Sequence, residues 1–235
     1  MPCGRGLSEL TGIPDERAAP STVKLPFLRH PLLRQVEAQP PPWADGLGET
    51  ELAALRASRP HRRARLDKLL RPAGIDLGGE PLAAVQALDH WTRTTWPGLI
   101  RRAWVRPGTE PWTGWQRATG EQAAAYTHAV DVAVALGELA LRAAPSFAWG
   151  VDRYDDHVAD GGPFVGRAVL LDPTLPDDAA APPVCSPIDL VVMRFEATGH
   201  RDFPDPPFVE GLRPVWWRDH RSLYVGPGAL ESTVP

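Results

Sequence analysis

Cysteine is scarce in this chain of 235 residues, which has only Cys3 and Cys185. Two cysteines so far apart in the sequence supply neither a disulfide framework nor a zinc cluster. The beginning of the chain has no apolar run long enough for a signal peptide. The longest apolar stretch, near 129–141, is interrupted by Asp131 and Glu138, so we expect no membrane span. These features predict a cytoplasmic protein in a reducing compartment.

The motifs that mark common catalytic and cofactor sites are also missing. The glycine pairs match neither a dinucleotide-binding fingerprint nor a phosphate-binding loop. Neither a nucleophile elbow nor an HExxH zinc motif accompanies the histidines. We therefore expect no cofactor and no bound metal, assign no catalytic residue, and favour a protein that is not an enzyme.

Proline, by contrast, is abundant, with 27 residues. Prolines at 14, 20, 26, 31 and 40–42 block regular helices near the N-terminus, because each fixes φ and removes a backbone donor. We expect residues 1–47 to form an extended arm ahead of a single domain over 48–235. The apolar patch 23–33 is either a strap docked on that domain or a short peptide that a partner captures.

Hydrophobic spacing predicts several helices in the first part of the domain. The expected helices are 49–58, a second one from Pro60 to about residue 70, 80–96 ending before Pro97, and about 120–143. A capping box from Thr119 to Gln122 opens the last of them. The polar stripe of that helix is narrow, which indicates a mostly buried central helix.

Strand patterns follow the central helix. The alternating segments 146–153 and 164–171 predict an antiparallel hairpin, and the loop between them consists of turn residues. The fold class predicted is therefore α+β, with N-terminal helices and a long central helix packed on a small antiparallel sheet.

The last third of the chain is less regular. Ser186, Pro187 and Asp189 resemble a helix start, with a hydroxyl cap, proline at the first position and a carboxylate at the third. Residues 188–196 are also compatible with a strand. Residues 200–235 are expected to be mostly irregular.

One stretch resembles known proteins. The segment AVALGELALRAAPSFAW (133–149), with its LGE motif before a Trp-bearing strand, resembles uncharacterised bacterial proteins with a small α+β domain. Leu88-Asp89-His90-Trp91 in the preceding helix is similar to theirs as well. The resemblance covers about 80–200 and implies an interaction module, in some cases of toxin-immunity type. It supplies no catalytic residues.

Acidic residues crowd the hairpin loop, where Asp152, Asp155, Asp156 and Asp160 surround His157. Carboxylates are ligands that Ca²⁺ and Mg²⁺ prefer, but the spacing does not match a calcium-binding EF-hand loop. Aspartate also favours turns through hydrogen bonds to its own backbone. We favour a solvated loop, and we keep Asp152, Asp155, Asp156 and His157 as candidate binding residues.

The C-terminal part of the chain is acidic. Residues 145–235 carry fourteen acidic residues against seven arginines, and Asp177 and Asp178 lie in the Pro-rich loop 172–185. Charge of one sign steers the encounter with an oppositely charged partner. We therefore predict another protein with a basic surface as the partner, add Asp177 and Asp178 to the candidate binding residues, and leave the oligomeric state open.

The polar stripe of the central helix offers two pairs. His128 and Asp131 are three residues apart, and Glu138 and Arg142 are four apart, spacings at which side chains meet. A His–Asp pair can serve as an oriented general base, whereas such a stripe is usually the outer edge of a buried helix. We favour the structural interpretation and keep Glu138, in the LGE motif, as a candidate binding residue.

A basic run precedes these elements. Residues 56–71 carry seven arginines and lysines against one acid, Asp67. Such a run can grip phosphates, but the whole chain has a net charge of −4 and three leucines interrupt the run. We favour a solvated helix face and do not expect nucleic acid as a partner.

Three functions remain open. A non-catalytic macromolecule-binding protein of immunity or adaptor type is favoured. A small metal-assisted hydrolase using the loop 152–160 comes next, and a nucleic-acid-binding accessory protein using the helix 59–71 comes third.

Overall fold

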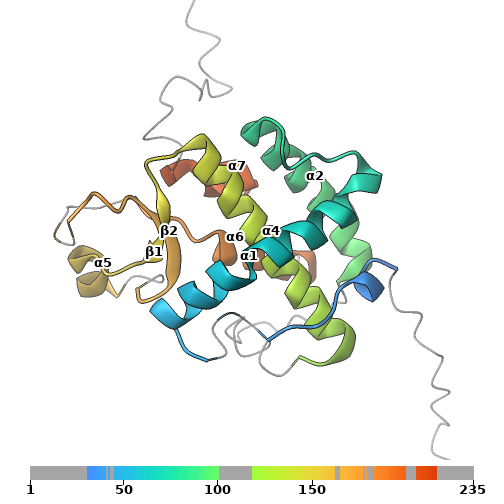
Figure 1. Ribbon diagram of the computed structural model, residues 1–235, viewed down its shortest axis with the longest axis horizontal. Helices are drawn as coiled ribbons and strands as arrows, with labels where there is room; N and C mark the ends of the chain where they lie inside the picture. The colour runs from blue at the N-terminus through green and yellow to red at the C-terminus, as the bar shows by residue number, and fades with distance from the viewer. Residues whose placement is uncertain are drawn as a thin grey trace, which may run out of the picture.

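The computed structural model describes residues 31–40, 42, 45–100, 118–161, 165–176, 178, 183–199 and 205–215. Helices surround one long central helix, and a two-stranded antiparallel sheet packs against them (Figure 1), which confirms the predicted α+β class. Several predictions lie outside the described residues: those for most of the arm, for Asp177 and for the tail after 215.

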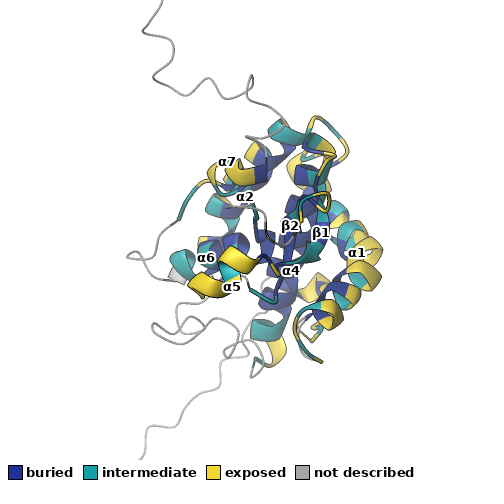
Figure 2. Ribbon diagram, turned by 90° about the vertical axis from the view of Figure 1, so that its left-hand side faces the viewer, coloured by how far each residue is buried: buried dark blue, intermediate teal, exposed yellow. Residues whose placement is uncertain are grey.

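The central helix, α4, spans Gly120–Ala143, as predicted. It is buried over most of its length and lies in the middle of the molecule (Figure 2). This helix is long and apolar enough to cross a membrane, but 89% of its most apolar window is buried inside the protein, which is typical of a core helix. Thr119 is the N-cap residue, but its side chain makes no capping hydrogen bond, so that part of the predicted capping box is wrong.

The helix α1 spans Glu49–Leu70 without a break, so the prediction of two helices separated before Pro60 is wrong. Proline removes one backbone donor and disturbs one turn, at a cost of about 3 kcal/mol. Burial on both sides of Pro60 offsets that cost, because Leu52 and Leu55 before it and Leu66, Leu69 and Leu70 after it all lie in the core.

The helix α2 spans Pro81–Leu99 and includes Pro97, which does not end it. The Glu80 side chain caps its beginning by accepting from the N–H groups of Leu82 and Ala83, at 3.0 and 2.7 Å. The connection between α1 and α2 contains the short 3₁₀ helix η2, Arg71–Ala73.

The sheet consists of β1, Ala148–Val151, and β2, Ala168–Leu171, paired antiparallel with Trp149 opposite Leu170. The hairpin is confirmed, with strands shorter than the predicted segments. Trp149 packs directly on α4 at Gly137, where an added Cβ would lie 2.3 Å from the indole ring. The glycine of the LGE motif is therefore required for this close approach.

The helix α6, Pro187–Gly199, follows the predicted start. Ser186 Oγ accepts from the Asp189 N–H at 3.1 Å, which confirms the hydroxyl cap and resolves the alternative at 188–196 in favour of a helix. Part of the predicted irregular tail is also helical, because α7 spans Phe208–Gly211 and buries Phe208.

The described end of the N-terminal arm is docked on the body. It contains a short 3₁₀ helix, η1, over Leu33–Gln35, and buries Leu33 and Val36. The Gln39 N–H donates to Thr127 Oγ of α4 at 2.9 Å. The docked-strap interpretation concerned residues 23–33, of which only 31–33 are described, and within these the burial of Leu33 agrees with it.

Candidate functional site

The acidic segment between the strands forms a short helix, α5, Asp155–Asp160, so the prediction of a loop made only of turns is wrong. Two aspartates in the first turn suit the positive end of the helix dipole. Gly161 ends the helix with φ at +65°, a conformation that glycine adopts without strain. Asp155, Asp156 and Asp160 are exposed, and Figure 2 shows α5 as one of the most exposed elements.

Asp152 and His157 have a different position from the other residues of this group. The Asp152 side chain is buried, and His157 Nδ1 lies 2.9 and 3.0 Å from its two carboxylate oxygens. Tyr154 is also buried, and its hydroxyl donates to the Asp172 carbonyl oxygen at 3.1 Å. These contacts hold in place the segment that leads from β1 into α5. Asp152 and His157 therefore position α5, while Asp155 and Asp156 face outward.

The acidic residues do not converge on a metal site. Within the described residues, no three His, Cys, Asp or Glu side chains are grouped closely enough to hold a metal ion. Asp178, from the second acidic group, is exposed.

Glu138 is held in an ion-pair cluster between α4 and α1. Its carboxylate lies 3.2 Å from Arg59 Nε and 3.0 Å from Arg63 Nη1. Arg142 does not pair with it, contrary to the spacing argument, and donates instead to the Leu77 carbonyl oxygen at 2.6 Å. Glu138 thus joins two helices, and its side chain is only 20% exposed.

The basic run of α1 is directed largely at α4. Arg65 forms a bidentate pair with Asp131, with both contacts at 2.6 Å, and Arg62 adds a third at 3.1 Å. The Asp131 carboxylate is fully buried. Burial raises its pKa, while the two guanidiniums oppose that shift. The interpretation of this run as a solvated face is wrong for Arg62 and Arg65.

His128 does not pair with Asp131, so the hypothesis of an oriented general base there is wrong. His128 is completely buried, and the Trp96 indole N–H donates to its Nε2 at 3.3 Å. Trp91 and Trp96 pack edge-on against the ring, with centroids 5.5 and 6.0 Å away. Burial lowers the pKa of His128 to about 3, so the imidazole is neutral at physiological pH.

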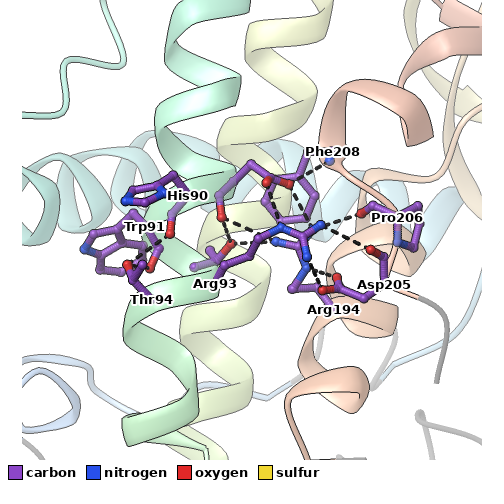
Figure 3. A network of polar contacts seen from close by, with 10 residues as sticks. His90, Trp91, Arg93, Thr94, Arg194, Asp205, Pro206 and Phe208 are labelled. Atoms are coloured by element: carbon purple, nitrogen blue, oxygen red, sulfur yellow. Dashed lines mark hydrogen bonds and ion pairs between the residues drawn. The ribbon is translucent and has the colours of Figure 1, made fainter. Parts of the chain in front are cut away.

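A further charged cluster, centred on Arg194 of α6, is one that the sequence did not reveal (Figure 3). The Arg194 side chain is 2% exposed and pairs with Asp89 at 2.9 Å and with Asp205. It also donates to Thr92 Oγ at 3.0 Å and to the Pro206 carbonyl oxygen at 2.9 Å. Arg194 therefore ties α2, α6 and the segment before α7 together.

Asp89 completes this cluster. It accepts from the Phe208 N–H at 2.8 Å and from Arg93 Nε at 2.9 Å. Burial opposes its charge, but these donors and the Arg194 guanidinium together lower the pKa of Asp89. The Asp of the LDHW motif thus has a structural role. The one sequence feature that could have pointed to this cluster is Arg194 itself, a charged residue inside the apolar run VVMRF.

Another buried group joins α1 to the start of β2. Glu51 is fully buried and pairs with Arg167 through contacts at 3.0 and 3.2 Å. It also accepts from the Ala168 N–H at 3.1 Å. Nearby Asp189 has one buried carboxylate oxygen, Oδ2, without a hydrogen-bond partner. Burial raises the pKa of Asp189 to about 6.

Asp189→Asn is expected to stabilise the protein at pH 8 by about 1–3 kcal/mol, from the difference between the folded and unfolded pKa values. Because the folded pKa is raised, the ionised carboxylate destabilises the fold above pH 6, and both states are protonated below about pH 4. The gain should therefore shrink to nothing as pH falls from 6 to 4. Urea denaturation at pH 4, 6 and 8 measures it, and a gain that is equal at all three would contradict this account.

Comparison with known proteins adds no assignment to this geometry: no family model, curated protein or solved structure matches the chain.

Proposed function

We propose that this protein is a non-catalytic binding protein of immunity or adaptor type, acting in the cytoplasm, that recognises a basic surface on another protein through α5. The observation that carries the proposal is the exposure of Asp155, Asp156 and Asp160 on α5. The contact between buried Asp152 and His157 holds this helix in place. An anchored charged helix presents its side chains without a large ordering cost on binding.

The distribution of the other charges supports this choice over the two alternatives. Four arginines of 59–71 that a nucleic-acid-binding helix would use are paired with acids of the protein itself: Arg59, Arg62, Arg63 and Arg65 contact Glu138, Asp131 or Asp67. The acidic residues that a metal-assisted hydrolase would use are divided between the anchor and the outer face of α5. The role that remains for α5 is to steer a basic partner with its exposed carboxylates.

The double variant Asp155→Asn with Asp160→Asn is expected to lose capture of partner proteins. In a pull-down from the source cells at low salt, yields should fall by about tenfold, because clustered charge mainly accelerates association. Raising the salt should reduce capture by the parent in the same way, since attraction between exposed charges is largely screened beyond about 8 Å at physiological ionic strength and at shorter distances as the salt rises further. The melting temperature should not change, because exposed charges contribute little to folding.

The matched control is Glu37→Gln with Asp45→Asn, which removes two exposed acids elsewhere on the molecule. It should capture the same proteins as the parent. Equal yields from the parent and the α5 variant at low salt would rule out α5 as the binding element.

A further inference from the structure

The outer side of α1 is exposed along most of its length, as Figure 2 shows. Three of its exposed cations, Arg56, Lys68 and Arg71, lie within one sector of about 120° around the helix axis, because each residue turns the helix by about 100°. Arg71 belongs to this side because its backbone keeps helical φ and ψ after the last residue of α1. At about 1.5 Å per residue, the three cations span about 22 Å along the helix.

The positive charges of these three side chains are not neutralised within the described residues. Lys68 and Arg71 make no ion pair there. Arg56 donates through Nη2 to the Trp149 carbonyl oxygen at 2.8 Å, which fixes the side chain but gives it no counter-charge and leaves most of its five N–H donors. By contrast, the arginines of α1 that reach α4 are held by acids. In a chain whose net charge is −4, the outer side of α1 is therefore locally basic.

The surroundings of these cations decide which anionic partner fits. The exposed residues beside them include Ala57, Pro60 and Ala64, so this side of α1 offers no large apolar side chain that could enter a membrane. Three cations release few counterions from duplex DNA, which gives nucleic acid little affinity. Carboxylates, in contrast, pair individually with guanidinium and ammonium groups through charge-assisted hydrogen bonds. A narrow acidic chain lying along the helix therefore fits this surface best.

We propose that the outer side of α1 is a second binding surface, which takes an acidic segment of a partner protein, with Arg56 at one end and Lys68 and Arg71 at the other. This inference goes beyond the proposed function and does not rest on α5. Figures 1 and 2 both show α1 and α5 on opposite sides of the β1–β2 pair, so the two surfaces can be occupied at once. A protein with one basic and one acidic binding surface joins two partners of opposite charge.

Fluorescence anisotropy of labelled polyglutamate at low salt tests the inference on the full chain. A probe of about 20 residues reaches across the three cations whether it is helical or extended. The parent should bind it, and added salt should weaken binding. Lys68→Gln with Arg71→Gln should weaken binding at least about tenfold, because two pairing groups are lost. Arg56→Gln should weaken it at least about threefold, since the segment runs along the whole surface. Arg34→Gln with Arg213→Gln, at exposed arginines on η1 and after α7, is the matched control and should bind like the parent.

Several results would overturn the inference. They are a parent that does not bind polyglutamate, an α1 variant that binds it like the parent, and a control that loses as much as Lys68→Gln with Arg71→Gln. Tighter binding to duplex DNA or to phosphatidylserine vesicles than to polyglutamate also overturns it, because the surface would then select phosphate instead of carboxylate. The substituted side chains are exposed, so the variants should melt within a few degrees of the parent, and their binding then reports on the surface and not on the fold.

Separate variants test this inference and the proposed function. Asp155→Asn with Asp160→Asn should bind polyglutamate at least as tightly as the parent, since α5 takes no part in that contact. If this variant captures everything the parent does while Lys68→Gln with Arg71→Gln loses polyglutamate, the α5 proposal fails and the basic surface of α1 is supported. The reverse pattern excludes the surface on α1 and supports α5.

Discussion

Asp131→Asn is expected to lower the free energy of unfolding by about 3–5 kcal/mol, because it leaves buried arginines without their counter-charge. Asp131 is fully buried and holds Arg62 and Arg65, whose side chains are only 4% and 15% exposed. Asparagine keeps the shape of the aspartate side chain and removes only its charge. For a chain of this size the melting temperature should fall by roughly 10 °C. Urea denaturation at pH 7.5 measures the change directly.

Glu138→Gln is the matched control, because Glu138 also joins α4 to α1 through two arginines. Its partners are more exposed, so the loss should be about 1 kcal/mol or less. A triple variant with Asp131→Leu, Arg62→Met and Arg65→Met should recover much of the stability, since removing a whole buried ion cluster is often nearly neutral. If Asp131→Asn costs no more than Glu138→Gln, Asp131 does not have the structural role described for it.

The central helix was predictable because one physical signal dominates it. A sequence of 24 residues with one narrow polar stripe can bury its apolar surface only as a helix in the interior of the protein. The hairpin and the start of α6 were also predictable, since alternation and capping residues act locally. The prolines misled the prediction at Pro60 and Pro97, because local propensity is overridden where a helix packs along its whole length.

Charge partners could not be predicted, because they depend on which helices pack together. Arg62 and Asp131 are 69 residues apart in the sequence, and Arg194 and Asp89 are 105 apart. The run 56–71 therefore looked like a solvated or phosphate-binding face. Its partners became evident only when α1 lay against the polar stripe of α4. Likewise, nothing in the sequence distinguishes Asp152 from the other aspartates of the acidic loop, and only the structure places it beside His157.

His128 is expected to make the protein sensitive to acid. Its folded pKa is lowered to about 3, while an unfolded histidine titrates near 6.5. Below about pH 6.5 the unfolded chain binds a proton that the folded protein does not, so stability is full above that pH and falls as pH decreases toward 3. The loss from this residue amounts to about 4–5 kcal/mol at pH 3.

The variant His128→Gln tests this, because glutamine cannot titrate and offers an oxygen to the Trp96 indole N–H that now bonds to His128. At pH 8 it should be less stable than the parent by about 1–2 kcal/mol, as a core substitution usually is. The difference should shrink and then reverse as pH falls, since only the parent has this histidine to protonate on unfolding. Protonation of Asp189 adds stability as pH falls from 6 to 4, opposite to the effect of His128. The quantity to measure is therefore the difference in unfolding free energy between parent and variant at each pH. His90→Gln, at an exposed histidine on α2, is the control for the substitution itself and should be about as stable as the parent at pH 8. A His128→Gln profile that runs parallel to the parent from pH 8 to pH 4 would show that His128 is not held neutral in the core.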